Sequence, residues 1–576
     1  MDASDEMSAR DVSVGQTLAL FDSRFPDLVD EVGEGKYAFW LGSGISRDRL
    51  ADVPTLVGRI LRYLQEAIDP SDPNCSYRRA LTAALTLAML SEAEQSHVDF
   101  ARDIGEWETY DTIVDRLTRH YSELLDIRID GEAPDFLLWS VVDVPRTYGD
   151  DAIQPDLEHL CLAVLIMEGV LPEVVSANWD GLIEKAVAEL AGGSNSLLSV
   201  RVTSEDFRDA LGRGRILKFH GCAVKAKLDE HHYRTYLVGR RSQITNWPND
   251  ADHSVMRQEM INLAATRRTI MIGLSAQDEN IQQLFSTARG TLAWQWPADR
   301  QAFVFAEDAI GRDQQNVLRV AYGDSYDGND AEIAQASLIR AFAKPLLAAF
   351  VVATIAKKLA VFAQLSEMLA DDPSFRLGIE QGIRALRTLA AAGIDRAIGS
   401  SVRTLISEVG RAMSLFREGN PPPQPMTYSP LGSVPVNQIS DDPTLLSGGM
   451  PQLAVAIVLL GSEHAAGTWV VSTDSVQNSP RPVLRVSAGG LSSRLVFASN
   501  PAAAVRLEMN GFADETDAEV VVVHSTGRPF VQQRSPSSAP GRTGRKAARH
   551  IDMVEIISES STFGDLQQRF REEITL

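Results

Sequence analysis

Asn178, Asp180 and His220 are the side chains of this sequence best suited to catalysis. The amide of Asn178 can hydrogen-bond a hydroxyl group or a water without adding charge, and the imidazole of His220 can accept a proton near neutral pH. The carboxylate of Asp180 can stabilise developing positive charge, or it can cap a helix expected to begin at Leu182. A turn residue is the simpler interpretation of Asn178, and a core histidine that of His220. Their positions directly after expected strands favour catalysis.

A glycine turn is a second candidate for chemistry. Gly42-Ser43-Gly44 follows the apolar segment 37–41, and Ile45 and Ser46 come next. A strand, a glycine turn and a helix present backbone N–H groups to a phosphate. The full dinucleotide-binding fingerprint needs a third glycine, which is missing, so the turn is not specific on its own. A helix cap is the alternative role for Ser46.

Repeated strand, turn and helix units surround these residues. The apolar segments 37–41, 173–176, 215–219, 268–272 and 301–305 are expected to be strands. Such repetition indicates an α/β fold with a parallel sheet. Ligands of parallel sheets bind at the carboxyl ends of the strands, where the polar turns of this sequence fall.

The chain is expected to have four parts. Residues 1–34 form a tail and a helix at about 17–32, and residues 35–330 form the α/β domain, with a helical insertion at about 57–170. Residues 331–420 are a helical segment, which ends at three consecutive prolines. Residues 421–576 are expected to form a small β-rich domain, an antiparallel sheet or sandwich, with a terminal helix at 562–573. Its strands are predicted at 452–460, 468–472, 483–486, 494–497, 504–509 and 519–523.

The charge and the cysteine content of the chain argue against some classes of function. The formal net charge of −22 argues against nucleic-acid binding over the whole surface. The basic segment 528–549 is an exception and is interpreted as a mobile loop. The three cysteines form no CxxC pair and no disulfide framework, which favours a reducing cytoplasm. We find no signal peptide, and the apolar stretch 346–355 is too short to span a bilayer, so no membrane partner is expected.

Four motifs in order resemble the sirtuin family of NAD-consuming enzymes. They are Gly42-Ser-Gly-Ile-Ser46, Ser176-Ala-Asn178-Trp-Asp180, Lys218-Phe-His220-Gly221 and Gly273-Leu-Ser275. The sequence looks most similar to the bacterial sirtuin-like NADases of antiphage defence. Sirtuins usually have alanine at the position of Ser43. The resemblance covers about residues 35–325 and implies a Rossmann-like sheet.

The resemblance implies an NAD⁺ glycohydrolase with Asn178, His220 and Asp180 as catalytic residues. The residues implied to contact NAD are Gly42, Ser43, Gly44, Ile45, Ser46, Gly273, Ser275 and Asp278. Ser275 and Asp278 are candidates for the adenosine half, although Ser275 also suits a simple turn. Deacylating sirtuins carry two CxxC pairs that hold a structural zinc, and this sequence has none, so we expect no zinc.

Two other functions stay open: an NAD-dependent protein deacylase or ADP-ribosyltransferase, and a non-catalytic module that senses NAD or ADP-ribose. An NADase that is always active would kill its host, so the activity is expected to be gated by assembly. The resemblance implies a homo-oligomer and, as partner, a hexameric HerA-type ATPase/translocase. The alternative partner is a short Argonaute loaded with a guide.

Overall fold

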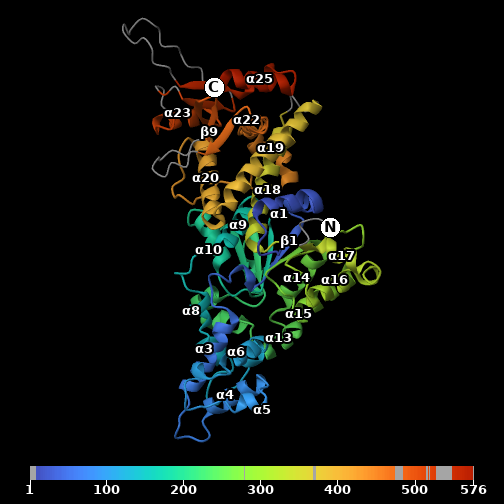
Figure 1. The fold of residues 1–576 in the computed structure, drawn as a ribbon, viewed down its shortest axis with the longest axis vertical. Coiled ribbons are helices and arrows are strands. Elements are labelled where there is room, and N and C mark those ends of the chain that lie inside the picture. The colour runs from blue at the N-terminus through green and yellow to red at the C-terminus, as the bar shows by residue number, and fades with distance from the viewer. Residues whose placement is uncertain are drawn as a thin grey trace.

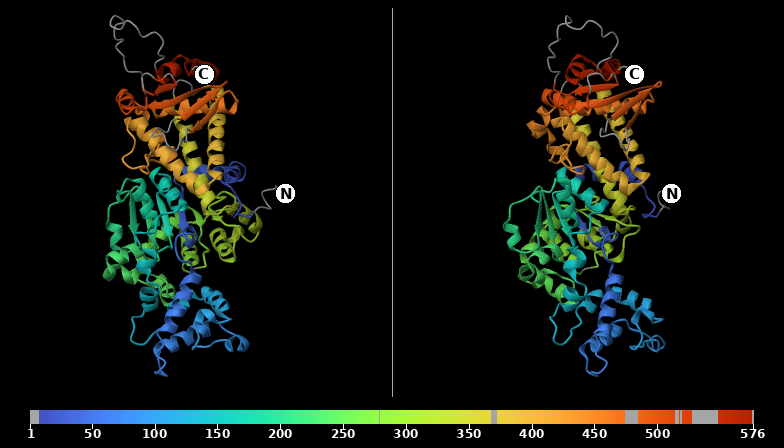
Figure 2. Two further views of the ribbon diagram at one scale, coloured as in Figure 1. Left: turned by 60° about the vertical axis from the view of Figure 1, so that its left-hand side comes forward. Right: turned by 90° about the vertical axis from the view of Figure 1, so that its left-hand side faces the viewer.

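The molecule consists of three tiers along its longest axis (Figure 1). The computed structural model describes residues 8–277, 279–366, 372–473, 484–513, 517, 519–526 and 548–574. A parallel sheet with its helices forms the middle tier. The helical insertion forms a separate lobe at the bottom, and the C-terminal sheet forms the top, an arrangement that the rotated views confirm (Figure 2).

The middle tier is a seven-stranded sheet in which every pairing is parallel. The order is β3-β4-β2-β1-β5-β6-β7. The strands are β1 (Tyr37–Leu41), β2 (Glu173–Ser176), β3 (Leu198–Arg201), β4 (Gly214–Lys218), β5 (Arg268–Ile272), β6 (Phe303–Ala306) and β7 (Leu338–Ile339). This confirms the predicted parallel α/β fold. The edge strands β3 and β7 were missed, since both are short and β3 alternates with polar residues.

Alternate residues of each strand pack against helices on opposite faces. Phe39 and Ile270 face one hydrophobic core, and Trp40 and Met271 face another. The first core includes residues of α1 (Val14–Arg24), α2 (Pro26–Gly33), α9 (Leu157–Met167), α10 (Leu182–Leu190) and α18 (Ala343–Gln364). The second includes residues of α14 (Ser254–Thr266), α15 (Glu279–Thr291), α16 (Arg312–Tyr322) and α17 (Asp330–Ser337). The single helix expected at 17–32 is two helices, because Pro26 cannot continue α1.

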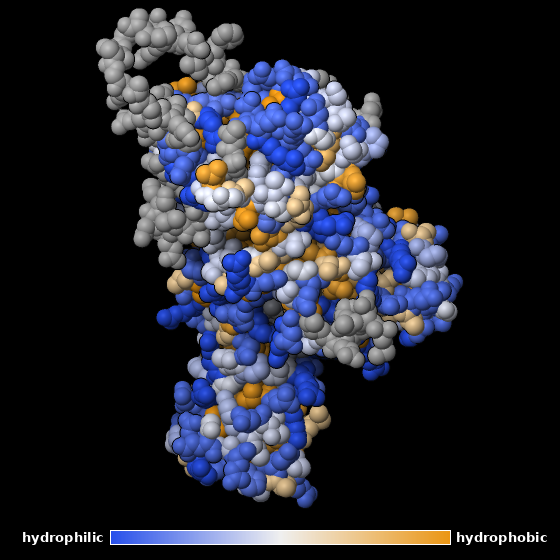
Figure 3. Space-filling model, turned by 45° about the horizontal axis from the view of Figure 1, so that its top comes forward, coloured by the Kyte–Doolittle hydropathy of each residue, from blue (hydrophilic) through white to orange (hydrophobic). Residues whose placement is uncertain are grey.

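The helical insertion has a core of its own, whereas α9, which lies inside the range predicted for the insertion, packs against the main sheet. The insertion contains α3 (Val53–Glu66), α4 (Ser76–Leu87), α5 (Glu92–Gln95), α6 (Tyr110–Arg119), α7 (Tyr121–Leu125), a π-helical turn (Leu137–Val141) and α8 (Val144–Tyr148). Leu56, Ile60 and Leu117 are fully buried in this core. Figure 3 shows the insertion as a lobe with a mainly hydrophilic surface.

Three long helices follow the sheet: α18, α19 (Pro373–Asp395) and α20 (Ile398–Glu418). By length and composition, α18 could cross a membrane, and it is longer than the apolar stretch that its sequence suggested. In the structure 67% of its apolar window is buried, and its Lys358 is buried with Glu168. The helix therefore serves as a core element that joins the middle tier to the top tier.

The C-terminal tier is a five-stranded mixed sheet of order β12-β11-β10-β9-β8. Its strands are β8 (Val470–Thr473), β9 (Leu484–Ala488), β10 (Leu491–Ala498), β11 (Val520–His524) and β12 (Arg549–Asp552). β10, β11 and β12 pair in parallel, so the prediction of an antiparallel sheet was only partly right. α24 (Met553–Glu559) and the terminal α25 (Phe563–Ile574) follow the last strand.

Two predicted C-terminal strands are helices. Residues 452–460 lie in α22 (Met450–Ala465), and residues 504–509 lie in α23 (Pro501–Met509). α22 is buried on nearly all sides, so its sequence is apolar throughout and has no helical periodicity. Asn500 caps α23 by accepting from the N–H of Ala503, which is a typical helix start signal. The basic segment 528–549 lies outside the described residues except at its last two positions.

Candidate functional site

Four strand ends lie in one row across the sheet. In the register of the strands, Leu41 is paired with both Ser176 and Ile272, and Ser176 is paired with Lys218. The turns that follow these residues therefore emerge side by side. The row is centred on β1, where the order of connections reverses, and α/β sheets bind their ligands at such a switch point.

Two glycine turns contact each other at this point. The N–H groups of Gly42 and Gly44 donate to the carbonyl oxygens of Ile272 and Gly273, at 3.1 and 3.2 Å. A Cβ on Gly44 would lie 2.6 Å from Gly273 Cα, and Gly273 has φ +63°. Only residues without side chains fit this contact. Such close packing is what brings bare backbone to the edge of the sheet.

Ser46 is the centre of a buried hydrogen-bond network. Its Oγ lies 3.0 Å from Asp180 Oδ2 and 3.1 Å from His159 Nε2. Asn178 Nδ2 lies 3.5 Å from the same oxygen and donates a 3.2 Å bond to the Gly42 carbonyl. All four side chains are buried. The network thus joins the first glycine turn, the turn after β2 and α9.

The backbone sets the tautomer of His159. The N–H of Asp156 donates to His159 Nδ1 at 3.1 Å, so the proton of the neutral imidazole lies on Nε2. Nε2 then donates to Ser46 Oγ, and the Ser46 hydroxyl donates to Asp180 Oδ2. Burial lowers the pKa of His159 more than the negative charges of Asp180 and Asp156 raise it. The lowered pKa favours the neutral imidazole.

Asp180 bonds the start of the helix, as one of its two predicted roles requires, and its role in stabilising positive charge stays a prediction. Its Oδ1 accepts a 3.1 Å bond from the N–H of Leu182, at the start of α10, and its Oδ2 accepts from Ser46. The carboxylate therefore caps the helix and also belongs to the buried network. Next to it, the Lys218 ammonium donates to the Asp180 carbonyl and pairs with Glu184 at 2.6 Å.

His220 lies in the turn after β4, beside the Asn178–Asp180 turn. The Trp179 indole N–H donates to the His220 carbonyl at 2.8 Å, and Val238 N–H donates to it at 3.0 Å. The ring centroid of His220 lies 4.2 Å from that of Phe219. Gly221 follows with φ +94°, and a Cβ there would lie 2.5 Å from the Tyr236 carbonyl oxygen. The turn is thus tightly held.

The remaining predicted site residues fall into different environments. Ser43 and Ser275 are exposed, whereas Ile45 is buried among core residues. Ala276, between Ser275 and the next helix, is buried with φ +56°, so the backbone turns sharply after β5. Asp278 lies outside the described residues. The assignment of these residues to NAD contacts stays a prediction.

His159 is the residue that sequence reasoning missed. It lies in α9, whose eleven residues are all buried, so its neighbours suggested only a core helix. One signal was present: His159 is the third residue after Asp156, and their reciprocal hydrogen bonds form a capping box at the start of α9. Within the described part of the chain, no group of three or more His, Cys, Asp or Glu residues could hold a metal ion.

The fold is that of a Rossmann-like domain, and the row of turns lies at the carboxyl edge of the parallel sheet, where such domains bind their ligands. The family model for the SIR2-like domain matches residues 172–323, so the chain contains a SIR2-like domain. A SIR2-like domain implies an enzyme that uses NAD. The matched range includes Asn178, Asp180, His220 and Gly273. The turn Gly42–Ser46 lies outside this range, but β1 pairs with β2 and β5 and so brings the turn to the same edge of the sheet. No curated protein matches the chain.

Proposed function

We propose that this protein is an NAD⁺ glycohydrolase, which cleaves NAD to nicotinamide and ADP-ribose with water as the acceptor. The observation that carries the proposal is the buried network of Asn178, Ser46, Asp180 and His159 beside the contacting glycine turns. The N–H groups of Gly42 and Gly44 are used between the turns, and what the turns offer a pyrophosphate is close approach to bare backbone. The network offers a fixed amide and a fixed carboxylate next to it.

Cleavage of the nicotinamide–ribose bond passes through an oxocarbenium-like ribose. A preorganised negative charge stabilises such a cation more than it stabilises the neutral ribose. Both oxygens of Asp180 already accept hydrogen bonds, so this carboxylate is held in place and acts through its charge. His220 is proposed to accept the proton of the attacking water.

Asn178 is proposed to position the water or a ribose hydroxyl. Its Nδ2 donates to the Gly42 carbonyl, which sets the direction of the amide. Its Oδ1 accepts no hydrogen bond from the described part of the chain, so it is the group left for the substrate or the water. An aspartate at this position would add a second negative charge beside Asp180.

The test is nicotinamide release by the full-length chain, alone and with a HerA-type ATPase. We expect Asn178→Ala and His220→Ala each to lower the rate by about a hundredfold to ten-thousandfold. Asn329→Ala and His231→Ala are matched controls, since the Asn329 side chain donates to the Ser325 carbonyl, outside the site, and His231 is exposed. Variants of Asn178 and His220 that melt like wild type and hydrolyse NAD at the wild-type rate would refute the mechanism.

The same assay separates the alternatives. Turnover of NAD without any acyl-peptide or protein acceptor supports the glycohydrolase, whereas turnover that needs an acceptor supports a deacylase or an ADP-ribosyltransferase. One stoichiometric zinc per chain would also favour the deacylase. A chain that binds NAD but leaves it intact for hours in every activated state would be a sensor of NAD.

We further propose a gated role in antiphage defence, in which activation depletes cellular NAD and aborts infection. The support is the resemblance of the four motifs, together with the harm that an ungated NADase would do to its host. The proposed assembly is a cytoplasmic homo-oligomer with a HerA-type hexamer, and a guide-loaded short Argonaute is the alternative partner. Co-purification of the full-length chain with each candidate partner tests the assembly.

A further inference from the structure

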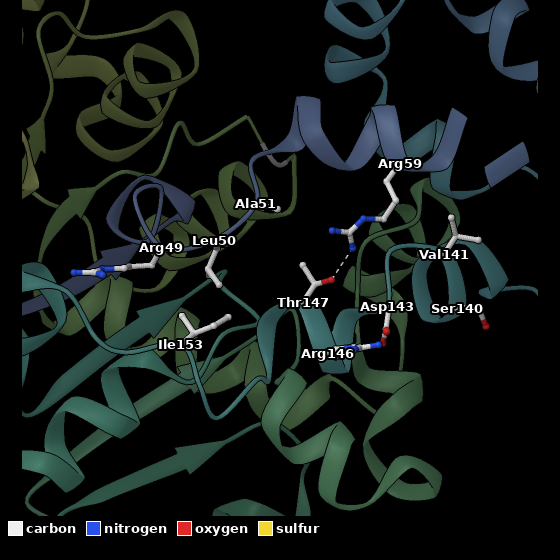
Figure 4. A pocket seen from close by; sticks show the side chains of 10 residues that line it. All are labelled: Arg49, Leu50, Ala51, Arg59, Ser140, Val141, Asp143, Arg146, Thr147 and Ile153. Carbon is white, nitrogen blue, oxygen red and sulfur yellow. Dashed lines mark hydrogen bonds between the residues drawn. The ribbon is translucent and has the colours of Figure 1, made fainter. Parts of the chain in front are cut away.

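A cavity of about 520 Å³, open to solvent and with exposed arginines, lies where the loop after the first glycine turn meets the helical insertion. Figure 4 shows the side chains around it. It is lined by Arg49, Leu50, Ala51, Arg59, Ser140, Val141, Asp143, Arg146, Thr147 and Ile153. None of the residues of the candidate NAD site is among them. Its volume is in the range of pockets that hold small organic ligands.

The lining of the cavity is strongly basic. It includes Arg49, Arg59 and Arg146 but only one carboxylate, that of Asp143. This carboxylate already accepts a hydrogen bond from the N–H of Arg146, at 3.3 Å. In a chain with a formal net charge of −22, such an excess of positive charge in one cavity points to an anionic ligand.

Two of these arginines have donors to offer. Arg59 Nη1 donates to the Val142 carbonyl at 2.9 Å and to Thr147 Oγ1 at 2.8 Å, which holds the guanidinium in place. A guanidinium has five N–H donors, so others remain. The Arg146 side chain makes no hydrogen bond or ion pair with any residue that the structure describes. Arg49 instead pairs with Asp156, at 2.9 Å.

The wall that carries Arg146 has an irregular backbone. The π-helical turn Leu137–Val141 precedes it, and Asp143 then takes a left-handed conformation with φ +52°. Asparagine and aspartate tolerate this region better than most residues, but it is still strained. π-Helical turns and strained residues are concentrated at binding sites, where they direct side chains toward a ligand.

We propose that this cavity binds a small ligand with at least two phosphate groups, at a site separate from that for NAD. Arginine is the side chain that best matches phosphate geometry. Figure 4 shows that Arg59 comes from α3 and Arg146 from α8, whereas the Arg49 guanidinium points away from both, toward its partner Asp156. Because Arg59 and Arg146 enter from different sides, an extended ligand with more than one anionic group satisfies them better than a single ion.

The cavity is connected to the buried network of Ser46 through Arg49 and Asp156. The inference that follows, regulation of NAD cleavage, rests on the proposed function. The partner of Arg49 is Asp156, whose backbone N–H sets the tautomer of His159. A phosphate that draws Arg49 away from Asp156 therefore acts on the start of α9. The ligand would regulate NAD cleavage without contacting NAD.

The test is titration calorimetry of the full-length chain with inorganic pyrophosphate, without NAD. We expect Arg146→Glu to weaken binding at least about tenfold, since a hydrogen bond between charged groups is lost. Arg119→Glu is the matched control, because Arg119 lies on the insertion with 76% of its side chain exposed. It should bind within about twofold of wild type. If Arg146→Glu melts at a lower temperature than wild type, the same titration is made with Arg146→Ala, which removes the positive charge without adding a negative one.

Hydrogen exchange locates the bound pyrophosphate. Protection of residues 140–147 in wild type, and its loss in Arg146→Glu, is expected. Absence of binding by wild type at millimolar pyrophosphate would overturn the proposal, as would equal binding by the arginine variant or protection confined to residues 42–46. Nicotinamide release is measured separately, so failure of the proposed NADase activity and failure of this binding site are distinguishable.

Discussion

Replacing Ser46 by alanine tests the buried network directly. The change removes the hydroxyl that accepts from His159 Nε2 and donates to Asp180 Oδ2. One buried N–H and one buried carboxylate oxygen then lose a partner. Each such loss costs about 1–3 kcal/mol, so the middle tier should lose about 2–6 kcal/mol of stability. Ser43→Ala is the matched control in the same turn, because Ser43 is exposed and should change stability by less than about 0.5 kcal/mol.

Native-state hydrogen exchange of the full-length chain is the suitable measurement, since a chain with several cores does not unfold in two states. Ser46→Ala should lower the protection of α9 and of the turn after β1, and should slow nicotinamide release at least tenfold. Ser43→Ala, which restores the residue usual in sirtuins, should leave both unchanged. Equal protection in the two variants would show that the network does not stabilise this site.

Three further changes test other contacts. Burial raises the pKa of Glu158 to about 7. The folded protein therefore holds the protonated carboxyl more tightly than the unfolded chain does, and the stability that this gives at low pH is lost as the pH rises through about 7. Glu158→Gln should thus stabilise the middle tier at pH 8, by about 2–4 kcal/mol, and much less at pH 5, in parallel melts. Gly273→Ala would place a Cβ 2.8 Å from Gly44 Cα and should weaken NAD binding at least tenfold in calorimetry, and unchanged binding would contradict the close contact of the turns. Lys358→Met leaves the buried Glu168 carboxylate without its 2.8 Å partner and should lower the denaturant midpoint by an equivalent of about 3–5 kcal/mol; a midpoint equal to wild type would exclude this role.

Local sequence patterns identified five of the seven strands of the main sheet. Segments such as 37–41 and 268–272 are short apolar runs that end in glycine, and β1 and β5 form there. The same logic failed at residues 452–460, because a helix buried on all sides is as uniformly apolar as a buried strand. It also missed β7, whose two residues pair with the ends of β6 and carry too little pattern to detect.

The sequence by itself determined the polar turns and their order. Asn178, Asp180 and His220 were identified because each comes directly after an apolar run, and the parallel sheet requires such residues to share one edge. The glycines of the first turn were identified for the same reason. These inferences depend on residues close together in the chain, for which local spacing is informative.

Only the tertiary structure decided which side chains meet. Ser46 and His159 are 113 positions apart, and Ser46 and Asp180 are 134 apart, yet the three side chains form one hydrogen-bonded chain. No local pattern contains this information, because contacts of such separation depend on how α9 packs against the sheet. For the same reason the arginine-lined cavity could not be foreseen: Arg59 and Arg146 come from opposite ends of the insertion.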